Sequence, residues 1–555
     1  MQMTGAQILI KSLINQGVDT VFGYPGGAVL NIYDALYQYS GEIKHILTCH
    51  EQNAAHAADG YSRSTGKTGV VIATSGPGAT NLVTGIATAF MDSIPMVAIT
   101  GNVAVNLLGK DSFQEVDIAG ITMPITKHNY IVKDVNQLEQ TVADAFRIAR
   151  SGRPGPVLID ITKDVTAALC DFQDIKIQPS ENNYNKFTSS DIEKAVKLIK
   201  KARKPFIYAG GGITSSGASS ELMEFAKKIN APVSVSLMAM GVYPFSDENY
   251  MGMIGMHGSR ASAKAVLNAD LVLAIGARFS DRVACNPKSF APNANIIHID
   301  IDEAEISKNV SVKLSLTGDV KAVLTELNKK LDNVSDRDFL DEMIEYKKQH
   351  PIDETKSEND FPAKIIQKAD ELTKGNAIFA TEVGQHQMWA AQFLKLDKPR
   401  RFISSGGLGT MGFGFGAAIG AKVANPDKTV FNIAGDGSFH MNLNELSTCV
   451  TKNLPVIVLL MNNNVLGMVR QWQKVFYQNR FSQTTLNKTT DYVKLAQAFG
   501  ANGYTISKEE DIEKVLKEAI SSKKTCVVNC IISEDANVLP MVAPGDSFDN
   551  QILDI

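Results

Sequence analysis

The sequence of 555 residues lacks long apolar runs and a marked excess of either charge. No stretch approaches the roughly 18 apolar residues that a membrane-spanning helix needs. The 55 basic and 59 acidic residues give a net charge of −4, which provides no field to attract nucleic acid or an anionic membrane. The first residues form an amphipathic pattern without a charged leader or an apolar signal core, so we expect a cytoplasmic protein.

Cysteine and tryptophan are also scarce. The six cysteines are scattered, and the closest pair, Cys526 and Cys530, falls on an expected strand, where positions four apart share a face. This pattern favours buried reduced thiols over a metal site or a redox pair. Only two tryptophans occur, and one of them, Trp472, lies in a helical stretch at 466–477.

The length and the order of apolar segments predict three domains. A chain of 555 residues is too long for a single core. Short apolar runs that end in glycine-containing turns alternate with helical stretches, which predicts α/β domains built on doubly wound parallel sheets. Polar or charged stretches at 173–190 and 342–360 are the expected linkers. We therefore expect domains at 1–170, 188–340 and 361–555.

The clearest site pattern lies in the last third of the chain. An apolar run at 430–434 enters the sequence GDGS at 435–438, and a later apolar run reaches NN at 462–463. In a parallel sheet both turns come to the carboxyl edge, where Asp436 and Asn463 would be neighbours. The glycines let backbone N–H groups surround a phosphate, and a carboxylate with an amide oxygen suits Mg²⁺. The alternative is an ordinary pair of turns in a Rossmann-like core.

This pattern resembles the diphosphate-binding motif of enzymes that use thiamine diphosphate (ThDP), which runs from GDG to NN over a similar spacing. The resemblance implies that Asp436, Asn463 and the main-chain carbonyl of Val465 bind Mg²⁺, and that the ion binds the cofactor diphosphate. It also implies a pyrimidine-binding first domain and a diphosphate-binding last domain.

Glu51 stands where an extended segment gives way to an alanine-rich helix. A glutamate in a first turn is usually a solvated residue that interacts favourably with the helix dipole. Alanines at 54, 55, 57 and 58 give this helix a small, buried character, so the carboxylate would be desolvated. By resemblance, Glu51 hydrogen-bonds the aminopyrimidine ring of ThDP and promotes loss of the C2 proton of the thiazolium.

Glycine-rich loops at 23–30 and 74–81 and the stretch 109–117 also match the ThDP family, although turn chemistry alone could explain the glycines. The resemblance places these loops at the pyrimidine half of the cofactor, with Gln114 nearest the reacting carbon. Met411 would ordinarily fill a core, but the resemblance makes it the wedge that bends the cofactor. The other ThDP-binding residues that it implies are Gly26, Gly27, Pro77, Val383, Gly384, Gln385, His386, Gly409, Gly435, Gly437, Ser438, Leu466, Gly467 and Met468.

The middle of the chain carries a weaker nucleotide-binding pattern. An apolar run leads into three glycines at 210–212 and a Ser/Gly turn opens a helix, but the spacing is not GxGxxG. Asp300 and Asp319 follow later apolar runs and could accept hydrogen bonds from ribose or ribityl hydroxyls. With the stretch around Arg153, these segments resemble the FAD-binding domain of the acetohydroxyacid synthase (acetolactate synthase) large catalytic subunit. This resemblance covers essentially the whole chain.

In that family FAD is bound without reacting in the main turnover, so the resemblance implies a structural flavin. Ser280 departs from the family, in which many members have aspartate. The FAD-binding residues that the resemblance implies are Arg153, Gly210, Gly211, Gly212, Ser236, Leu237, Gly255, Met256, His257, Gly258, Gly276, Ala277, Arg278, Phe279, Ser280, Asp300, Ile301, Asp319 and Val320.

Two further residues concern the substrates. Trp472 shares a helix face with Met468, and core packing is its alternative role. In the synthase family this tryptophan shapes the pocket for the second substrate. Arg282 would meet a 2-keto-acid carboxylate, for which a planar guanidinium is the best partner. The terminal stretch 537–555 could cover this pocket as a lid.

The activity that the resemblance implies is that of an acetolactate synthase. Pyruvate would lose CO₂ on ThDP, and the hydroxyethyl carbanion/enamine would add to a second 2-keto acid. Pyruvate as acceptor would give 2-acetolactate and 2-ketobutyrate would give 2-aceto-2-hydroxybutyrate, the first step of valine, leucine and isoleucine biosynthesis. The alternatives are a catabolic, FAD-independent acetolactate synthase and a pyruvate oxidase-type flavin oxidoreductase.

The resemblance also implies partners. It predicts a homodimer or a dimer of dimers with active sites at the interface, so that Glu51 and Asp436 of one site come from different subunits. A separate small regulatory subunit is also implied. A pyruvate decarboxylase-like enzyme would have a His-His pair where this chain has Phe113-Gln114.

Overall fold

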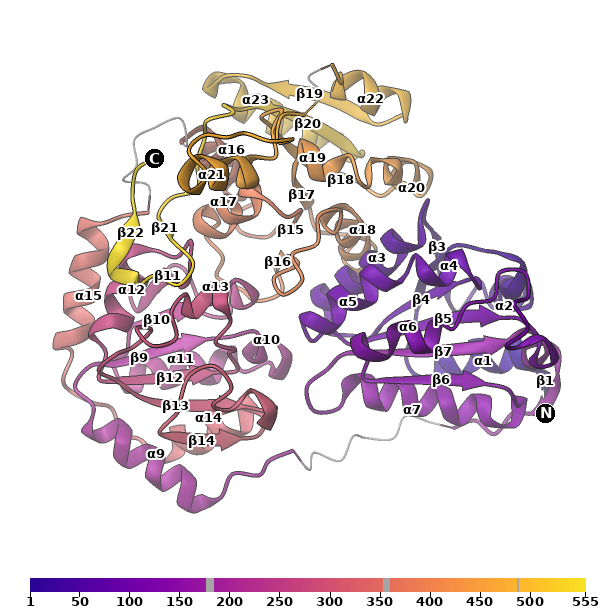
Figure 1. Ribbon diagram of the computed structural model, residues 1–555, viewed down its shortest axis with the longest axis horizontal. Helices are drawn as coiled ribbons and strands as arrows, with labels where there is room; N and C mark the ends of the chain where they lie inside the picture. Colours follow the sequence, from indigo (N-terminus) through magenta and orange to yellow (C-terminus); the bar gives the residue numbers. More distant parts are fainter. Residues whose placement is uncertain (176–183, 353–359, 487–488) are drawn as a thin grey trace.

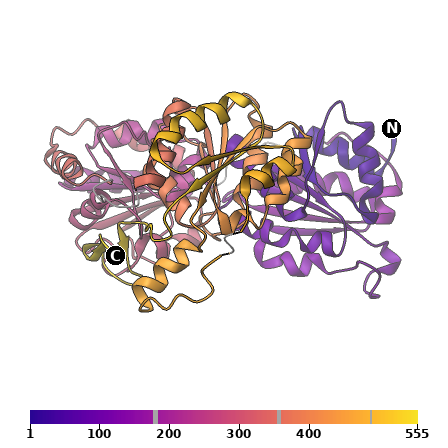
Figure 2. The ribbon, with the colours of Figure 1, turned by 90° about the horizontal axis from the view of Figure 1, so that it is seen from above.

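Three α/β domains follow one another along the chain (Figure 1). The computed structural model describes residues 1–175, 184–352, 360–486 and 489–555. Each domain contains a six-stranded sheet in which every neighbouring pair is parallel, as the sequence predicts. Seen from above, the third domain lies between the other two (Figure 2). None of the helices in the described ranges is long and apolar enough to cross a membrane.

The first sheet has the strand order β3-β2-β4-β5-β7-β6. Its strands β4, β5 and β7 are buried at every position, as expected for a sheet covered on both faces. The chain order reverses between β2 and β4, so the loops after these strands open a crevice at the carboxyl edge. The elements are β1 (Gln2–Thr4), α1 (Gly5–Asn15), β2 (Thr20–Gly23), α2 (Leu30–Gln38), β3 (Lys44–Leu47), α3 (Glu51–Thr65), β4 (Gly69–Ala73), α4 (Pro77–Thr80), α5 (Val83–Met91), β5 (Met96–Asn102), α6 (Ile118–Thr122), β6 (His128–Val132), α7 (Leu138–Arg150), β7 (Pro156–Thr162), α8 (Lys163–Ala167) and β8 (Leu169–Asp171).

The second sheet has the order β11-β10-β9-β12-β13-β14, and its chain order reverses between β9 and β12. Its first helix opens with a capping box in which Thr188 and Asp191 exchange hydrogen bonds. The elements are α9 (Ser189–Lys201), β9 (Pro205–Ala209), α10 (Gly212–Ser216), α11 (Ser219–Lys228), β10 (Val233–Val235), β11 (Tyr250–Met253), α12 (Arg260–Asn268), β12 (Leu271–Ile275), α13 (Asp281–Ala284), β13 (Asn295–Asp300), β14 (Leu314–Thr317), α14 (Val320–Lys330) and α15 (Asp338–Gln349).

The third sheet has the order β16-β15-β17-β18-β20-β19, with its reversal between β15 and β17. The elements are α16 (Asp360–Leu372), β15 (Ile378–Thr381), α17 (Gln385–Phe393), β16 (Phe402–Ile403), α18 (Gly414–Ala424), β17 (Val430–Gly435), α19 (Asp436–Phe439), α20 (Leu446–Thr451), β18 (Val456–Asn462), α21 (Gly467–Phe476), α22 (Tyr492–Ala498), β19 (Asn502–Ile506), α23 (Glu509–Ser522) and β20 (Cys526–Ile531). Cys526 and Cys530 are buried on β20, and all six cysteines are free thiols, although Cys49 is exposed.

Helices α3 and α18 lie side by side and join the first domain to the third (Figure 1). A methyl group added to Gly60 would overlap the backbone of Ala417, and one added to Gly420 would overlap the backbone of Ala57. Glycine therefore permits the two helix backbones to approach closely. The small, buried character that the alanines predict for α3 is explained by this contact.

The second expected linker, 342–360, is not a plain loop over its whole length. The charged stretch 342–360 begins inside α15, because Phe339, Leu340 and Met343 form a buried apolar stripe on that helix. The high charge of the opposite face conceals this stripe in the sequence. Residues 353–359 and the part of the first linker at 176–183 lie outside the described residues.

The end of the chain packs on the second domain. Strands β21 (Met541–Val542) and β22 (Gln551–Ile552) form an antiparallel pair. The backbone N–H of Val542 donates to the carbonyl of Met256 at 2.8 Å. Met541 and Phe548 are buried in the apolar cluster of that domain. The terminal stretch predicted as a lid therefore lies against the predicted FAD side.

Candidate active site

The carboxyl edge of the third sheet holds the GDG and NN turns side by side. Gly435 of β17 lies opposite Met461 of β18, and Asp436 and Asn463 follow directly from these strands. Asp436 is 1% exposed, and its Oδ2 atom has no hydrogen-bond partner among the described residues. Burial raises the pKa of Asp436 to about 6. A buried carboxylate oxygen without a partner fits a cation site, since a cation would satisfy it.

The loops after β15, β17 and β18 meet around Asn463. Its Oδ1 accepts from the backbone N–H of Val465 at 3.2 Å, and its Nδ2 donates to Oε1 of Gln385 at 3.4 Å. A Cβ added to Gly435 would lie 2.8 Å from Nδ1 of His386, so glycine is needed for this approach. The predicted ThDP residues that these three loops and the following helix starts carry are Val383, Gly384, Gln385, His386, Gly435, Gly437, Ser438, Leu466, Gly467 and Met468.

Glu382 belongs to the same edge, although sequence reasoning missed it. It follows β15 directly and is fully buried. Its carboxylate accepts from the backbone N–H groups of Gly412 at 2.8 Å and Phe415 at 2.9 Å, from Ser438 Oγ at 2.9 Å and from Asn442 Nδ2 at 2.6 Å. Burial raises the pKa of Glu382, although these donors oppose the rise. The residue joins the loop before α18 to the GDGS turn, and its only sequence signal was its place directly before the predicted Val383.

Glu51 begins α3, where the sequence predicts a helix start. It is 9% exposed, and Asn81 Nδ2 donates to its Oε2 atom at 2.9 Å. A Cβ added to Gly78 would lie 3.2 Å from its Oε1 atom. Gly76, with φ of 59°, packs so closely on Gln114 that an added Cβ would lie 2.9 Å from the Gln114 Cα. The structure thus brings Glu51, the glycine loop after β4 and Gln114 together.

The loop after β2 joins this group. The backbone N–H of Ala28 donates to Thr74 Oγ1 at 3.3 Å. A Cβ added to Gly26 would lie 2.5 Å from the Cβ of Thr74, while Gly27 has open space beside it. Pro77 is the first residue of α4, a position that suits proline. The predicted pyrimidine-side loops are therefore neighbours at one sheet edge.

Glu445 of the third domain holds the start of α3, and sequence reasoning missed it too. Its carboxylate accepts from the backbone N–H groups of Cys49 at 2.9 Å and His50 at 3.2 Å, and from Asn53 Nδ2 at 3.2 Å. Thr448 Oγ1 donates to it at 2.6 Å. These bonds satisfy N–H groups at a helix N-terminus. Because Glu445 and Cys49 are 396 positions apart, no local pattern reveals the contact.

A cavity of about 1970 Å³ lies where the three domains meet. Arg282 from the second domain and Trp472 from the third both line it, with the guanidinium carbon 5.7 Å from the ring centroid. Met411 and Met468 line the same cavity. These four residues, predicted from three separate stretches of the sequence, therefore line one cavity.

Most residues of the predicted FAD site line the second-domain side of this cavity. Gly210, Gly255 and Gly258 are not among the lining residues; a Cβ added to Gly255 would lie 2.6 Å from the Arg282 carbonyl, and one on Gly258 would lie 2.6 Å from the Met253 carbonyl. These three glycines instead allow neighbouring backbone segments to pack closely. The predicted FAD residues that line the cavity are Arg153, Gly211, Gly212, Ser236, Leu237, Met256, His257, Gly276, Ala277, Arg278, Phe279, Ser280, Asp300, Ile301, Asp319 and Val320.

The polar groups of this side suit a ligand with hydroxyl and ring nitrogen groups. Burial raises the pKa of Asp300 to about 6 and lowers that of His257 to about 4. The Nδ1 atom of His257 has no hydrogen-bond partner within the described part of the chain. Asp319 accepts a backbone N–H of α14 at 3.0 Å, and Arg153 pairs with Glu305 at 3.0 Å.

The three domains match three family models for thiamine pyrophosphate enzymes. These are the N-terminal TPP binding domain over residues 3–121, the central domain over 192–327 and the C-terminal TPP binding domain over 382–530. The chain is 47% identical to the acetolactate synthase of Mycobacterium bovis over 99% of its own length and 91% of that protein. The chain belongs to the acetolactate synthase family of thiamine pyrophosphate enzymes.

Other members of the family are similarly close. The chain is 44% identical to the acetolactate synthase large subunit of Haemophilus influenzae, covering 100% of this chain and 98% of that protein. It is also 44% identical to the acetolactate synthase isozyme 2 large subunit of Escherichia coli, with 98% of each chain covered. The resemblance stated from the sequence is thereby confirmed, and the protein is a ThDP-dependent enzyme. Both of these relatives are named as large subunits.

Proposed function

We propose that this acetolactate synthase family member decarboxylates pyruvate and joins the remaining two-carbon unit to a second 2-keto acid. The product is 2-acetolactate from pyruvate or 2-aceto-2-hydroxybutyrate from 2-ketobutyrate, at the first step of branched-chain amino acid biosynthesis. The observation that carries the proposal is the pairing of Arg282 with Trp472 at 5.7 Å, in the cavity that Met411 also lines. The relatives give no support to the catabolic or oxidase-type alternatives.

Asp436, Asn463 and the carbonyl of Val465 are the proposed Mg²⁺ ligands. The unpartnered Oδ2 atom of Asp436 supports this assignment, as does the position of Asn463 on the adjacent strand end. Among the described residues, no group of three or more His, Cys, Asp or Glu side chains could hold a metal. The proposed set has only one carboxylate, which suits an ion that keeps phosphate oxygens as ligands.

Bound ThDP supplies a nucleophilic ring carbon and an electron sink for decarboxylation. The chain must hold the cofactor so that this carbon loses its proton. One oxygen of Glu51 accepts a hydrogen bond from Asn81 at 2.9 Å, which leaves the other oxygen to hold a proton for the pyrimidine ring.

Arg282 and Trp472 are the proposed binders of the second substrate. The guanidinium fork of Arg282 matches a carboxylate, and its position beside Trp472 places that charge next to an apolar surface. Met411 and Met468 add further apolar surface to the same cavity. Once the cofactors fill the cavity, these apolar surfaces help to exclude water, which disfavours protonation of the two-carbon unit before the acceptor arrives.

FAD is the proposed occupant of the second-domain side of the cavity. The volume of about 1970 Å³ accommodates a ligand larger than the two keto acids. Asp300 and Asp319 at adjacent strand ends supply carboxylate acceptors, and the unpartnered Nδ1 of His257 supplies a further polar group. We assign the flavin a structural role.

A homodimer or a dimer of dimers, with active sites at the interface, is proposed as the working assembly. Exposed apolar side chains of the first domain support an interface on that domain, since Phe113, beside Gln114 in the chain, is 88% exposed and Met123 is 69% exposed. In this assembly Glu51 and Asp436 of one site belong to different subunits. We propose the domain limits 1–170, 188–340 and 361–555 for each chain.

The test is product analysis of the purified chain with pyruvate, ThDP, Mg²⁺ and FAD. Acetolactate as the main product supports the proposal, and Asp436→Ala should then lose activity together with Mg²⁺-dependent ThDP binding. Acetaldehyde or peroxide as the main product would assign the chain to decarboxylase or oxidase chemistry. Unchanged ThDP affinity in Asp436→Ala would remove the metal assignment.

A further inference from the structure

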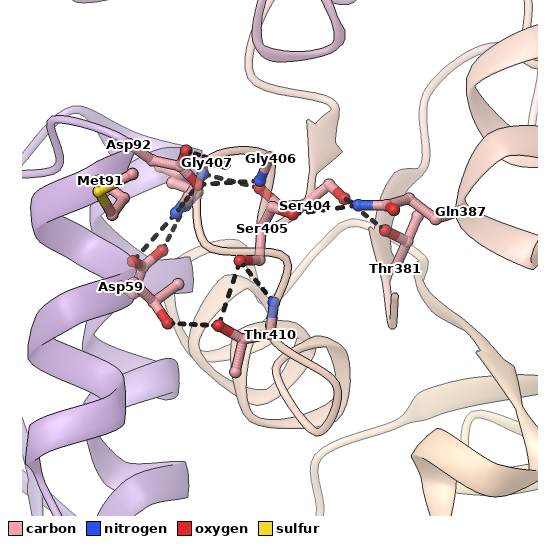
Figure 3. A network of polar contacts seen from close by, with 12 residues as sticks. Asp59, Met91, Asp92, Thr381, Gln387, Ser404, Ser405, Gly406, Gly407 and Thr410 are labelled. Carbon is pink, nitrogen blue, oxygen red and sulfur yellow. Dashed lines mark hydrogen bonds and ion pairs between the residues drawn. The ribbon is translucent and has the colours of Figure 1, made fainter. Parts of the chain in front are cut away.

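Three buried charges lie where the first and third domains meet. Asp59 and Arg63 lie one turn apart on α3, and Asp92 follows α5. Their exposed fractions are 0%, 7% and 8%. The Arg63 side chain donates through Nε and Nη2 to Asp59, and through Nη2 to Asp92 Oδ2 at 2.9 Å. Figure 3 shows Asp59 and Asp92 within this network.

The charges of the first domain hold a loop of the third. Arg63 Nη1 donates to the carbonyl of Ser404 at 2.8 Å. The backbone N–H of Gly406 donates to Asp92 Oδ2 at 3.1 Å and that of Gly407 donates to Asp92 Oδ1 at 2.7 Å (Figure 3). Both oxygens of Asp92 are therefore used by the loop.

The far end of the same loop is also in contact with Arg63. The guanidinium carbon lies 5.1 Å from the ring centroid of Phe413, which is a cation–π distance. Thr88 Oγ1 and Thr410 Oγ1 are hydrogen-bonded at 2.8 Å. The loop 404–413 is thus fixed by the first domain near both of its ends, and Met411 lies within it.

The segment that carries Asp92 also contacts the predicted FAD side. Arg278 Nη2 donates to the carbonyl of Met91 at 2.9 Å, and Arg153 Nε donates to Ser93 Oγ at 2.8 Å. Three consecutive residues, 91–93, therefore each hold a different part of the cavity wall. A displacement of residues 91–93 would therefore shift the Met411 loop and the flavin side of the cavity at the same time.

We propose that Asp92 is a positioning residue. It fixes the position of the Met411 loop, residues 404–413, relative to the flavin side of the cavity. It acts through Gly406 and Gly407 and does not touch the reacting atoms. The inference rests on the proposed function only for its effect on turnover, because the contacts themselves belong to the chain without any cofactor.

The charges explain why an ordinary packing residue would not serve. Two carboxylates and one guanidinium leave one negative charge in a buried place, which is costly unless donors surround it. The N–H groups of Gly406 and Gly407 are these donors. These two hydrogen bonds favour the loop position in which both N–H groups reach Asp92. A buried ion pair is weak evidence for stability, so the role that we assign to this one is to fix the position of the loop.

Asp92→Asn tests the proposal with little change of shape. The amide offers one acceptor oxygen in place of two, and its NH₂ group would face a backbone N–H. In hydrogen–deuterium exchange of the full, cofactor-free chain, peptides spanning 404–413 should exchange about tenfold faster. The control is Asp144→Asn, which removes the same charge from an exposed pair with Arg147 on α7 and should leave these peptides unchanged.

The kinetic result separates positioning from general damage. We expect kcat of Asp92→Asn to fall about tenfold, because a misplaced group costs rate even when binding persists. ThDP affinity should change less than kcat, because the proposed diphosphate ligands lie on other loops and only Gly409 and Met411 of the ThDP residues belong to this one. FAD affinity should fall through the Met91–Arg278 contact. A purely structural role would instead lower the amount of folded enzyme at unchanged kcat per folded site.

Gly407→Ala approaches the same contact from the loop and leaves the buried charges in place. The added Cβ would lie 2.8 Å from Asp92 Oδ1 and 3.0 Å from the Met91 carbonyl, so the loop must move away. If Asp92→Asn fails to fold, hydrogen–deuterium exchange of residues 404–413 in Gly407→Ala tests the positioning role instead. Normal exchange at 404–413 with normal kcat in Gly407→Ala overturns the proposal, as it does in a folded Asp92→Asn. If the wild-type chain makes no acetolactate, the proposed function fails while the exchange experiment still decides the positioning role.

Discussion

At the residue scale, Asp160 shows how burial inside the first sheet affects a carboxylate. It accepts from Thr100 Oγ1 at 2.6 Å and from Asn102 Nδ2 at 2.5 Å, and it is 1% exposed. Burial nevertheless raises its pKa to about 6, since the donors only partly offset desolvation. Compared with the unfolded chain, the fold therefore favours the protonated form of Asp160. The stability that this form contributes is complete below pH ~4 and is lost as the pH rises through ~6.

Asp160→Asn should remove this pH dependence. The free energy of unfolding of the wild type, measured relative to the variant, should fall by ~2 to 3 kcal/mol between pH ~4 and ~7. Urea unfolding at several pH values measures this difference, with Asp341→Asn, which affects an exposed pair with Arg337, as the control. Parallel pH profiles for wild type and Asp160→Asn would show that Asp160 does not titrate in this range.

Glu51→Gln should separate chemistry from binding. The amide keeps the size of the side chain but cannot hold the proton that the pyrimidine ring requires. We expect turnover to fall by about 100-fold or more, while ThDP affinity changes less than about threefold. Steady-state kinetics and a ThDP titration measure the two quantities. The control is Glu42→Gln, which affects an exposed pair with Lys11, and full turnover in Glu51→Gln would remove Glu51 from the mechanism.

At the element scale, the start of α3 depends on a residue of another domain. Glu445 accepts two backbone N–H groups at this helix terminus and is itself buried. Glu51 directly follows His50, whose backbone N–H is one of these two donors. The position of the proposed proton-holding group therefore depends on the contact between the first and third domains.

Glu445→Gln should loosen this helix start. The neutral amide is a weaker acceptor and its NH₂ group would oppose one backbone donor, so we expect a loss of ~1 to 3 kcal/mol in the free energy of unfolding. Turnover should fall as well, because Glu51 loses its fixed place. Urea unfolding and kinetics measure both effects. Wild-type values for both would show that the helix start is held by other contacts.

Much of the arrangement of strands, helices and turns could be predicted from the sequence. Alternating apolar runs and glycine turns predicted three parallel α/β sheets, and the GDG and NN turns indeed follow paired strands. The charged stretch 342–360 predicts a linker, but its first part is the end of helix α15, whose buried stripe of Phe339, Leu340 and Met343 is too short to stand out in the sequence. Glu382, Glu445 and Asp92 are not predicted from the sequence, because their hydrogen-bond partners are distant in the chain and such contacts leave no periodic pattern.

At the scale of the whole molecule, the cavity is built by the junction of three domains. Arg282 comes from one sheet edge, Trp472 from another, and Met91 from the first domain. Glu51 has its polar contact within its own domain, to Asn81. Sequence reasoning assembled this site only through a family resemblance, since no local pattern states how domains meet.

Subunit mixing tests whether the site is shared between chains. Glu51→Gln and Asp436→Ala should each be inactive alone. If one site takes Glu51 from one chain and Asp436 from the other, a mixed dimer has one intact site, and random mixing should restore about a quarter of wild-type activity. The two variants are unfolded and refolded together, with each refolded alone as the control. An inactive mixture with proven exchange of chains would place both residues in the same subunit.

The most direct measurement is product analysis with pyruvate and 2-ketobutyrate supplied together, in the presence of ThDP and Mg²⁺, with and without FAD. The proposed biosynthetic synthase should form both 2-acetolactate and 2-aceto-2-hydroxybutyrate, and both products should depend on FAD. Trp472→Leu should then alter their ratio, because the ring beside Arg282 shapes the acceptor pocket. Acetolactate alone, formed at full rate without FAD, would contradict the account and favour the catabolic alternative.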